Sequence, residues 1–253
     1  MHSSRKRPCT RKLESGARSC HNIPVRRGLT PLLWLLLAGC HSPSREAAPA
    51  KPGRDEAHYP SHWWAPVSQE GAPAWEILPQ AAGAGEVILS KRNELGLLSN
   101  FAATPFIFQG QHYASLEGFW QMMKYPEGPA DPRATFPGLR WTYTRRQVAE
   151  LTGFEAKRAG TLGEENMRTM GIDWVSFEGR RFAYKPAIPG EHYRLIVAAT
   201  WAKVRQNPEV RRVLLATGSL VLKPDHYQEP NAPAAWRYYD ILMQIRAVLQ
   251  TEQ

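Results

Sequence analysis

The chain has 253 residues, a formal net charge of +9 and only three cysteines, at positions 9, 20 and 40. The positive charge is concentrated in residues 1–39, which hold eight lysines and arginines against one acid, Glu14. Without that segment the net charge falls to +2 (9 minus 7), so we expect no nucleic-acid partner attracted by bulk charge. A chain that starts at Cys40 has a single thiol, which excludes a disulfide framework and a cysteine metal site.

The segment VRRGLTPLLWLLLAGC, which ends at Cys40, has the order of a secretory signal: two arginines, a short apolar core, then small residues. The core is far shorter than the roughly 20 residues that span a bilayer. Its end, LAGC, resembles the lipobox of bacterial lipoproteins, in which the signal is removed and the cysteine thiol carries a lipid. The alternative is a chance apolar run beside a cysteine.

The lipobox resemblance assigns residues 1–39 to a signal peptide with an extra basic N-terminal stretch, and it predicts lipidation at Cys40. The protein would then be anchored in the outer membrane or elsewhere in the cell envelope. His41, in place of an aspartate after the cysteine, favours outer-membrane sorting in a bacterium with two membranes.

Residues 40–84 are rich in Pro, Ala, Gly and charge and have no sustained apolar period, which predicts a flexible tether. The triplet His62–Trp64 is an exception, and we expect these aromatics to dock the segment onto the following domain rather than to recognise a partner. From 85 to 253 the composition is globular, and its length fits one domain.

The domain is predicted to contain helices and a few short strands, in this order. EVILS (86–90) is a strand, and PFIFQGQHY (105–113) is two strands joined by a tight turn at Gln109-Gly110. TRRQVAELTG (144–153) is a short helix with Thr144 as N-cap, Gln147 in the capping-box position and Gly153 beyond its end. Helices follow over 191–207, 208–218 and 235–250, with a strand at 219–223. This pattern predicts a mainly helical α+β domain.

The stretch LEGFWQMMKY, after Ser115 as N-cap, predicts a largely buried helix that carries three polar residues on one face. Glu117, Gln121 and Lys124 fall at i, i+4 and i+7. Buried charges are paired or functional, because an unpaired buried carboxylate costs several kcal/mol. Two interpretations stay open from these residues: a structural ion network between Glu117 and Lys124, or a polar stripe that faces a cleft.

The same helix and three further motifs resemble the NADAR (YbiA-like) family. Its members share an SNF segment, a Ser/Thr-x-Glu-x-x-x-Gln-x-x-Lys helix, an Asp-Trp pair and a Lys-x-x-Gln-Asn…Leu-Leu-x-Thr-Gly helix pair. The matching positions, over about residues 96–246, are Ser99, Asn100, Phe101, Ser115, Glu117, Gln121, Lys124, Asp173, Trp174, Lys203, Gln206, Asn207, Leu214, Leu215, Thr217 and Gly218.

The resemblance implies a YbiA-like single domain that cleaves a ribosyl–nitrogen bond without a metal or cofactor. Family enzymes hydrolyse ribosyl–amine linkages in a riboflavin-pathway intermediate or remove ADP-ribose from guanine, so the expected ligand is a nucleotide or ADP-ribose-type molecule. Cleavage builds oxocarbenium character on the ribose, and a nearby carboxylate can stabilise that charge or activate water. The resemblance makes Glu117 the candidate for this role.

Substrate-binding roles follow from the same resemblance, each with a structural alternative. Asn100, beside Phe101 in the SNF segment, would bond ribose hydroxyls or form a turn, and Gln121 belongs to the polar face of the Glu117 helix. Trp174 would stack on a base or belong to the core. Lys124 and Arg158 would hold phosphate or pair with acids.

The sequence departs from the family after the Thr-Gly strand, where the Trp-Gly pair and the glycine-rich loop are absent. Asp225 and His226 stand there instead, and Asp225 either replaces the missing acid or caps a turn. His226 would carry a proton near neutral pH. Residues 175–192 form an insertion that is expected to reshape the pocket.

Three functions are therefore considered. The first is an N-glycosidase-like hydrolase anchored as a lipoprotein. The second is a lipoprotein that binds ADP-ribose or a nucleotide without catalysis, which the altered loop favours. The third is a structural envelope lipoprotein, against which the polar stripe argues.

Overall fold

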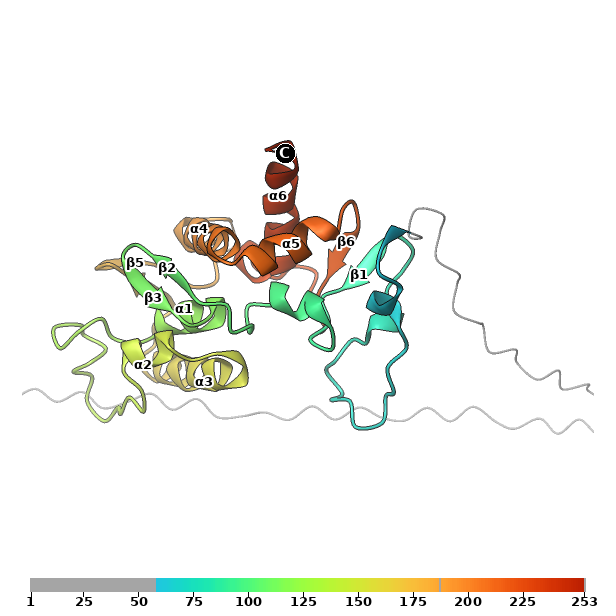
Figure 1. Cartoon of the computed structure of the whole chain (residues 1–253). Helices are drawn as coiled ribbons and strands as arrows, with labels where there is room; N and C mark the ends of the chain where they lie inside the picture. Colours follow the sequence, from blue (N-terminus) through green and yellow to red (C-terminus); the bar gives the residue numbers. More distant parts are fainter. Residues whose placement is uncertain (1–57, 187, 253) are drawn as a thin grey trace, which may run out of the picture. The chain divides into compact units, whose positions relative to one another are not determined.

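The computed structural model describes residues 58–186 and 188–252 (Figure 1). The predicted signal peptide, the predicted lipidation site Cys40 and the first part of the predicted tether lie outside the described residues. None of the helices in the described ranges combines the length and the apolar character needed to cross a membrane.

Helices are interspersed with short strands along the described part of the chain. The helices are α1 (Leu116–Met122), α2 (Arg145–Ala149), α3 (Gly153–Thr169), α4 (Glu191–Gln206), α5 (Pro208–Ala216) and α6 (Tyr238–Thr251). The strands are β1 (Glu86–Ile88), β2 (Phe106–Phe108), β3 (Gln111–Tyr113), β4 (Trp174–Phe177), β5 (Arg180–Ala183) and β6 (Val221–Lys223). The predicted mainly helical α+β class is confirmed.

The strands form three separate pairs. β1 and β6 are parallel, with Glu86 opposite Val221, so the two ends of the domain meet in one small sheet. β2–β3 and β4–β5 are antiparallel hairpins. Gln109 and Gly110 both have positive φ, 49° and 76°, which is the geometry of a two-residue hairpin turn, and the predicted turn is confirmed.

α1 is the most enclosed helix, and it packs against α2 and α3 (Figure 1). The Ser115 hydroxyl accepts a hydrogen bond from the Gly118 amide, so the predicted N-cap is confirmed. Glycines allow the close approach: a Cβ on Gly118 would lie 2.6 Å from the Leu151 carbonyl oxygen. Gly160 and Gly163 on α3 face the side chains of Gln121 and Lys124 in the same way.

The long helix α3 was not predicted from the sequence, which placed Gly153 after the end of a short helix. In the structure Gly153 is the first residue of α3, with φ of 55°. The buried positions of this helix are mostly small, namely Ala156, Ala159, Gly160, Gly163 and Met167. Small residues give little apolar periodicity, because hydropathy patterns are dominated by large side chains.

Residues 58–84 pack onto the domain, so this half of the predicted tether is part of the folded unit. Trp63 is 1% exposed, and its indole nitrogen donates to Glu94 at 2.7 Å. Trp64 donates to the Glu86 carbonyl at 2.8 Å, so the aromatic pair docks the segment. The described fold therefore begins by residue 58 rather than at 85. Composition misses this because a few aromatics fix a segment that is otherwise polar.

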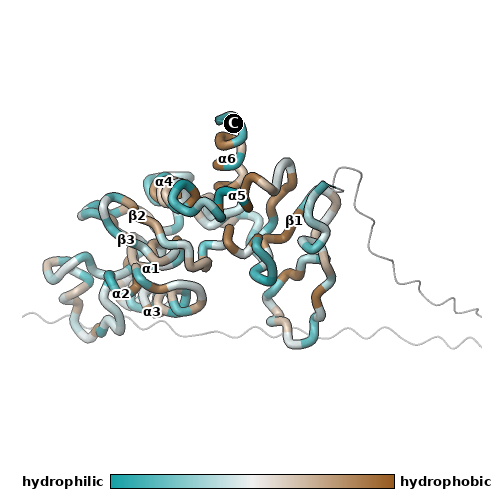
Figure 2. Tube along the Cα trace, in the orientation of Figure 1, coloured by the Kyte–Doolittle hydropathy of each residue, from teal (hydrophilic) through white to brown (hydrophobic). Residues whose placement is uncertain are grey.

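The hydrophobic core runs from the β1–β6 pair through α4, α5 and α6 to α1. Figure 2 shows β1 in brown, in line with the complete burial of Val87 and Leu89. Burying apolar side chains of this size is the main favourable contribution to folding, at about 1.5–3 kcal/mol each. The core holds one face of α1 rigidly and leaves the first turn of that helix beside a cavity.

Candidate active site

A cavity of about 560 Å³ lies beside the first turn of α1. Its lining comes from segments far apart in the chain: residues 74–77, Lys91, residues 99–101, α1, the start of α3, Tyr184, and residues 226–238. A pocket of this size fits a nucleoside or a small nucleotide. The predicted site residues that line it are Asn100, Phe101, Glu117, Gln121 and His226.

Glu117 is the buried acid of this cavity, at 6% exposure. Its only side-chain hydrogen bond among the described residues comes from the Gln121 amide, at 2.8 Å to Oε1, and no basic group there forms an ion pair with it. Burial raises the pKa of Glu117, and the Gln121 hydrogen bond and the charges of Lys157 and Lys124 offset only part of that rise. A carboxyl group with a raised pKa is suited to proton transfer near neutral pH.

Gln121 is positioned by the absence of a side chain at Gly160. A Cβ on Gly160 would lie 2.0 Å from Gln121 Oε1, closer than any side chain tolerates. The helix pair α1–α3 therefore places the Gln121 amide nitrogen on Glu117, while its Oε1 has no hydrogen-bond partner among the described residues.

Asp225 lies behind the wall of the cavity, and it holds two of the lining residues. Its carboxylate accepts from His226 Nδ1 at 3.0 Å and forms a short ion pair with Lys91 Nζ. Burial raises the pKa of Asp225, but the hydrogen bonds from His226 and Lys91 outweigh it and leave the pKa below its usual value. The bond to Nδ1 leaves His226 Nε2 to act on a ligand, the arrangement by which a carboxylate orients an imidazole.

Several buried polar atoms in the cavity wall have no hydrogen-bond partner in the described part of the chain. These are Gln121 Oε1, Gln228 Oε1, Trp236 Nε1 and Tyr238 Oη. Native proteins pair nearly all buried polar groups, because an unpaired one costs about 1–3 kcal/mol. The cavity wall therefore holds polar groups that the described residues do not satisfy.

Several lining residues were not predicted from the sequence. Trp75 lies in the segment assigned to the tether, and Tyr184 lies in the insertion that was expected to reshape the pocket. Phe154 and Lys157 lie on α3. Lys91 follows β1 without a motif. If the sequence had predicted helix α3, Lys157 would have been a candidate site residue. The residues around Trp75 show no pattern that would place it at the cavity.

Besides Asp225, three predicted site residues in the described ranges do not line the cavity: Lys124, Arg158 and Trp174. Lys124 lies beyond the end of α1, is 2% exposed, and donates to Gly160 O and Glu164 Oε2 at 3.1 and 3.2 Å. Arg158 is exposed on α3, next to the lining residue Lys157. The interpretation of an ion network between Glu117 and Lys124 is therefore wrong, because Lys124 pairs with Glu164 instead. Burial lowers the pKa of Lys124 to about 8.

Trp174, the third, begins β4 and packs against Arg133, which belongs to a separate polar network. The guanidinium carbons of Arg133 and Arg181 lie 4.7 and 4.2 Å from its ring centroid, so the ring that was predicted to stack on a base packs against two arginines outside the cavity lining. Arg133, 1% exposed, bonds Asp131, the Met123 carbonyl and Ser176.

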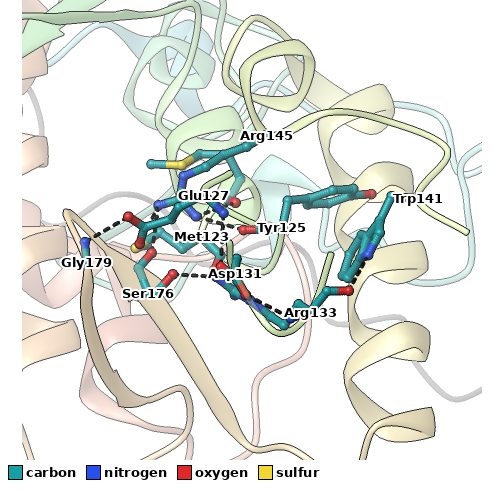
Figure 3. Close-up of polar contacts among 10 residues, drawn as sticks. Met123, Tyr125, Glu127, Asp131, Arg133, Trp141, Arg145, Ser176 and Gly179 are labelled. Carbon is teal, nitrogen blue, oxygen red and sulfur yellow. Dashed lines mark hydrogen bonds and ion pairs between the residues drawn. The ribbon is translucent and has the colours of Figure 1, made fainter. Parts of the chain in front are cut away.

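The network in Figure 3 fixes the β4–β5 hairpin to the end of α1. Arg145 donates to the carbonyls of Tyr125 and Ser176 at 2.9 and 2.7 Å, and Glu127 accepts from the Gly179 amide at 2.7 Å. Burial lowers the pKa of Arg145 to about 10. The hairpin leads directly to Tyr184, so this network positions one wall of the cavity from a distance.

The fold and the cavity define an α+β domain with a partly polar pocket beside α1. Among the described residues, no three His, Cys, Asp or Glu side chains gather as metal ligands.

Comparison with known proteins adds one structural likeness. No family model matches the chain, and no curated protein matches it. The solved NMR structure of the Escherichia coli protein YbiA is similar over 68% of this chain and 89% of its own, with 20% sequence identity and a TM-score of 0.42.

Proposed function

We propose that the protein is an N-glycosidase-like hydrolase that cleaves a ribosyl–nitrogen bond in a ribosylamino or ADP-ribosylated small molecule. The observation that carries the proposal is Glu117: a buried carboxyl group with a raised pKa, without an ion-pair partner among the described residues, in the wall of a nucleoside-sized cavity. The sequence motifs that resemble the NADAR family supply the bond type.

The reaction breaks the C1′–N bond and adds water to C1′. In our proposal Glu117 takes a proton from the attacking water and stabilises the positive charge that develops on the ribose. The nitrogen leaves with the bonding electron pair and takes a proton from His226 Nε2. Asp225 stabilises the protonated imidazole through Nδ1, at 3.0 Å, so the two proton-transfer groups are held independently.

Binding of the ribose is assigned to the wall atoms that lack a partner within the described ranges. Gln228 Oε1 accepts a hydrogen bond from a hydroxyl group, and Trp236 Nε1 donates one. A ribose offers hydroxyls that both donate and accept, so its chemistry suits both kinds of atom. Asn100 joins them from the SNF segment, where its backbone carbonyl also accepts from the Glu117 amide at 2.9 Å.

The test is turnover by the full chain with ADP-ribosylated guanosine and with a ribosylaminopyrimidine, measured as release of the free base or amine by chromatography. Wild type should release product, and Glu117→Gln should lower kcat by at least about 100-fold, since general acid–base groups contribute that much. Glu165→Gln, an exposed carboxylate on α3, is the matched control and should keep full activity. Equal turnover by Glu117→Gln would refute the proposal.

A second candidate is a protein that binds such a molecule without cleaving it. Its supporting observation is the loop around Asp225 and His226, which lacks the glycines of the resembling family. Calorimetry with ADP-ribose, run beside the turnover assay, separates the candidates. Micromolar affinity without product in any assay would favour binding alone.

The anchor remains a separate proposal. The LAGC motif supports lipidation of Cys40 and a place in the cell envelope, where the ligand would be a periplasmic or extracellular molecule. Fractionation of cells that express wild type or Cys40→Ala tests this, and a variant that stays in the membrane fraction would overturn it.

A further inference from the structure

The mouth of the cavity carries a group of aromatic rings that the hydrolysis itself does not use. Trp75 and Phe154 line the cavity yet are 44% and 61% exposed, whereas Glu117 and Gln121 are 6% and 4% exposed. The exposed members of the lining therefore lie at the opening and the buried members at the bottom. Large aromatics that gather at an opening indicate a binding surface, because isolated exposed rings are common but clustered ones are not.

The rings contact one another and come from three distant segments. Phe154 lies 5.9 Å from Trp75 and 5.3 Å from Phe101 between ring centroids. Lys91 Nζ lies 5.7 Å from the Trp75 ring and 5.2 Å from the Phe101 ring, and it is fixed by its ion pair with Asp225. The aromatic group is therefore tied to the same carboxylate that orients His226.

The two residues that follow Trp75 in the chain are fixed by hydrogen bonds and an ion pair. Glu76 forms a β-bridge with His226 and a bidentate ion pair with Arg92, at 2.7 and 2.6 Å. The Ile77 amide donates to the Asp225 carbonyl at 2.7 Å. Trp75 is thus presented by fixed backbone, which favours a preformed site.

A lysine stands next to the rings. Lys157 follows Phe154 by three residues on α3, so both lie on one face of the helix, and both line the cavity. None of the described carboxylates lies within ion-pair distance of Lys157. Its charge acts on Glu117, which lies deeper. An anionic group of a ligand is therefore favoured at the mouth and disfavoured at the bottom, next to a carboxylate.

We infer that Trp75, Phe101 and Phe154, with Lys157, form an outer subsite that binds a nucleobase and the phosphate attached to it, so the ligand is a nucleotide longer than the cleaved ribosyl unit. The inference rests on the proposed function in one respect only: the ligand is oriented so that its ribosyl–nitrogen bond lies at Glu117. Base stacking on aromatic rings tolerates different bases, and an ammonium group binds phosphate as a point charge.

Calorimetry with three probes tests the subsite on the full chain: AMP, adenosine and ribose 5-phosphate. Trp75→Ala and Phe154→Ala should each lower the affinity for AMP and for adenosine by about tenfold, because base stacking is lost. The affinity for ribose 5-phosphate should stay unchanged, because phosphate binding is kept. Phe136→Ala, an equally simple aromatic truncation at 38% exposure away from the cavity, is the control and should change none of them.

Lys157→Gln should lower the affinity for AMP and for ribose 5-phosphate several-fold, but it should leave the affinity for adenosine, which has no phosphate, unchanged. Arg158→Gln is its matched control, because it removes the same charge from the next residue, which does not line the cavity. Loss of AMP affinity that is equal in the two charge variants, or a Trp75→Ala variant within twofold of wild type for AMP, would overturn the inference. So would a wild type that binds none of the probes.

The two proposals fail separately. If AMP binding depends on Trp75 while neither substrate is turned over, the outer subsite stands and the hydrolase proposal falls. If the ribosylaminopyrimidine is hydrolysed through Glu117 and Trp75→Ala changes no nucleotide affinity, the hydrolase stands and the subsite falls. Melting temperatures of all variants, with Trp75→Phe as a milder substitution, show whether any loss comes from unfolding.

Discussion

The polar network around Arg133 and the polar wall at Glu117 both hold buried charge against α1, but they satisfy it differently. Asp131 accepts from the Arg133 side chain and from backbone amides, and although burial raises its pKa, these bonds bring the pKa to about 2. Glu117 has one side-chain hydrogen bond within the described ranges and a raised pKa. The first arrangement pairs its buried charges completely, and the second keeps a carboxyl group with a raised pKa and unpaired polar atoms beside a cavity.

Burial of charge therefore does not by itself indicate a site. What separates the two regions is completeness: within the described residues, every polar side-chain atom of Arg133 and Asp131 has a partner, whereas four atoms of the cavity wall have none. Charged groups buried with full pairing are structural, while groups left incomplete around a cavity fit a ligand.

The largest effect is expected from breaking the complete network. Arg133→Met removes the charged partner of the Asp131 carboxylate and one of the two donors to the Met123 carbonyl, and it should lower the free energy of unfolding by about 3–5 kcal/mol. Urea denaturation followed by circular dichroism measures this. A loss below about 1 kcal/mol would mean that the network is not a structural element.

A smaller effect, on activity, is expected at Gly160. Alanine there would drive a Cβ into Gln121 Oε1 and displace the amide that holds Glu117. Turnover should fall roughly tenfold, which corresponds to about 1.4 kcal/mol, while the helix itself gains from alanine.

A second variant isolates that cause. In a Gln121→Ala background the clash is gone, so adding Gly160→Ala should cost no stability and no further activity. If the double variant is much less active than Gln121→Ala alone, Gly160 matters for another reason than the position of Gln121.

Glu117 should affect the pH dependence of the protein's stability as well as turnover. Its pKa is raised in the folded state, so it binds more protons folded than unfolded, and its contribution to stability is lost as pH rises through its folded pKa. Glu117→Gln should flatten this decline from about pH 4.5 upward and be at least as stable as wild type at about pH 8. Melting curves across roughly pH 4–9 test this, and parallel curves for the two proteins would contradict it.

The smallest effect is expected at Trp174, which was predicted to stack on a base. Trp174→Phe should keep kcat and KM within about twofold, because the residue packs with Arg133 and Arg181 away from the cavity. A change in KM without loss of stability would return Trp174 to the substrate site.

The sequence predicted those parts that depend on local chemistry. The Ser115 cap, the turn at Gln109-Gly110 and the capping box at Thr144 and Gln147 are confirmed, since each is fixed by neighbouring residues. The spacing of Glu117 and Gln121 correctly places both on one helical face, where they bond each other.

The parts that the sequence did not predict depend on tertiary packing. α3 buries small residues and so lacks a hydropathy period, and Trp75 reaches the cavity only because Glu76 and Ile77 pair with the backbone at 225–226. The partner of Lys124 is Glu164, 40 residues away, and no spacing rule selects it over Glu117.

The central claim is that Glu117 acts on the sugar carbon of a ribosyl–nitrogen bond. A crystal structure of Glu117→Gln with an uncleaved ADP-ribosylated guanosine tests it most directly. The account predicts C1′ of the cleaved ribose in the cavity, with a water between it and the side chain of residue 117 at about 3 Å from each. A ligand that occupies the cavity with its glycosidic bond turned away from residue 117, or one that binds elsewhere on the domain, would contradict the account.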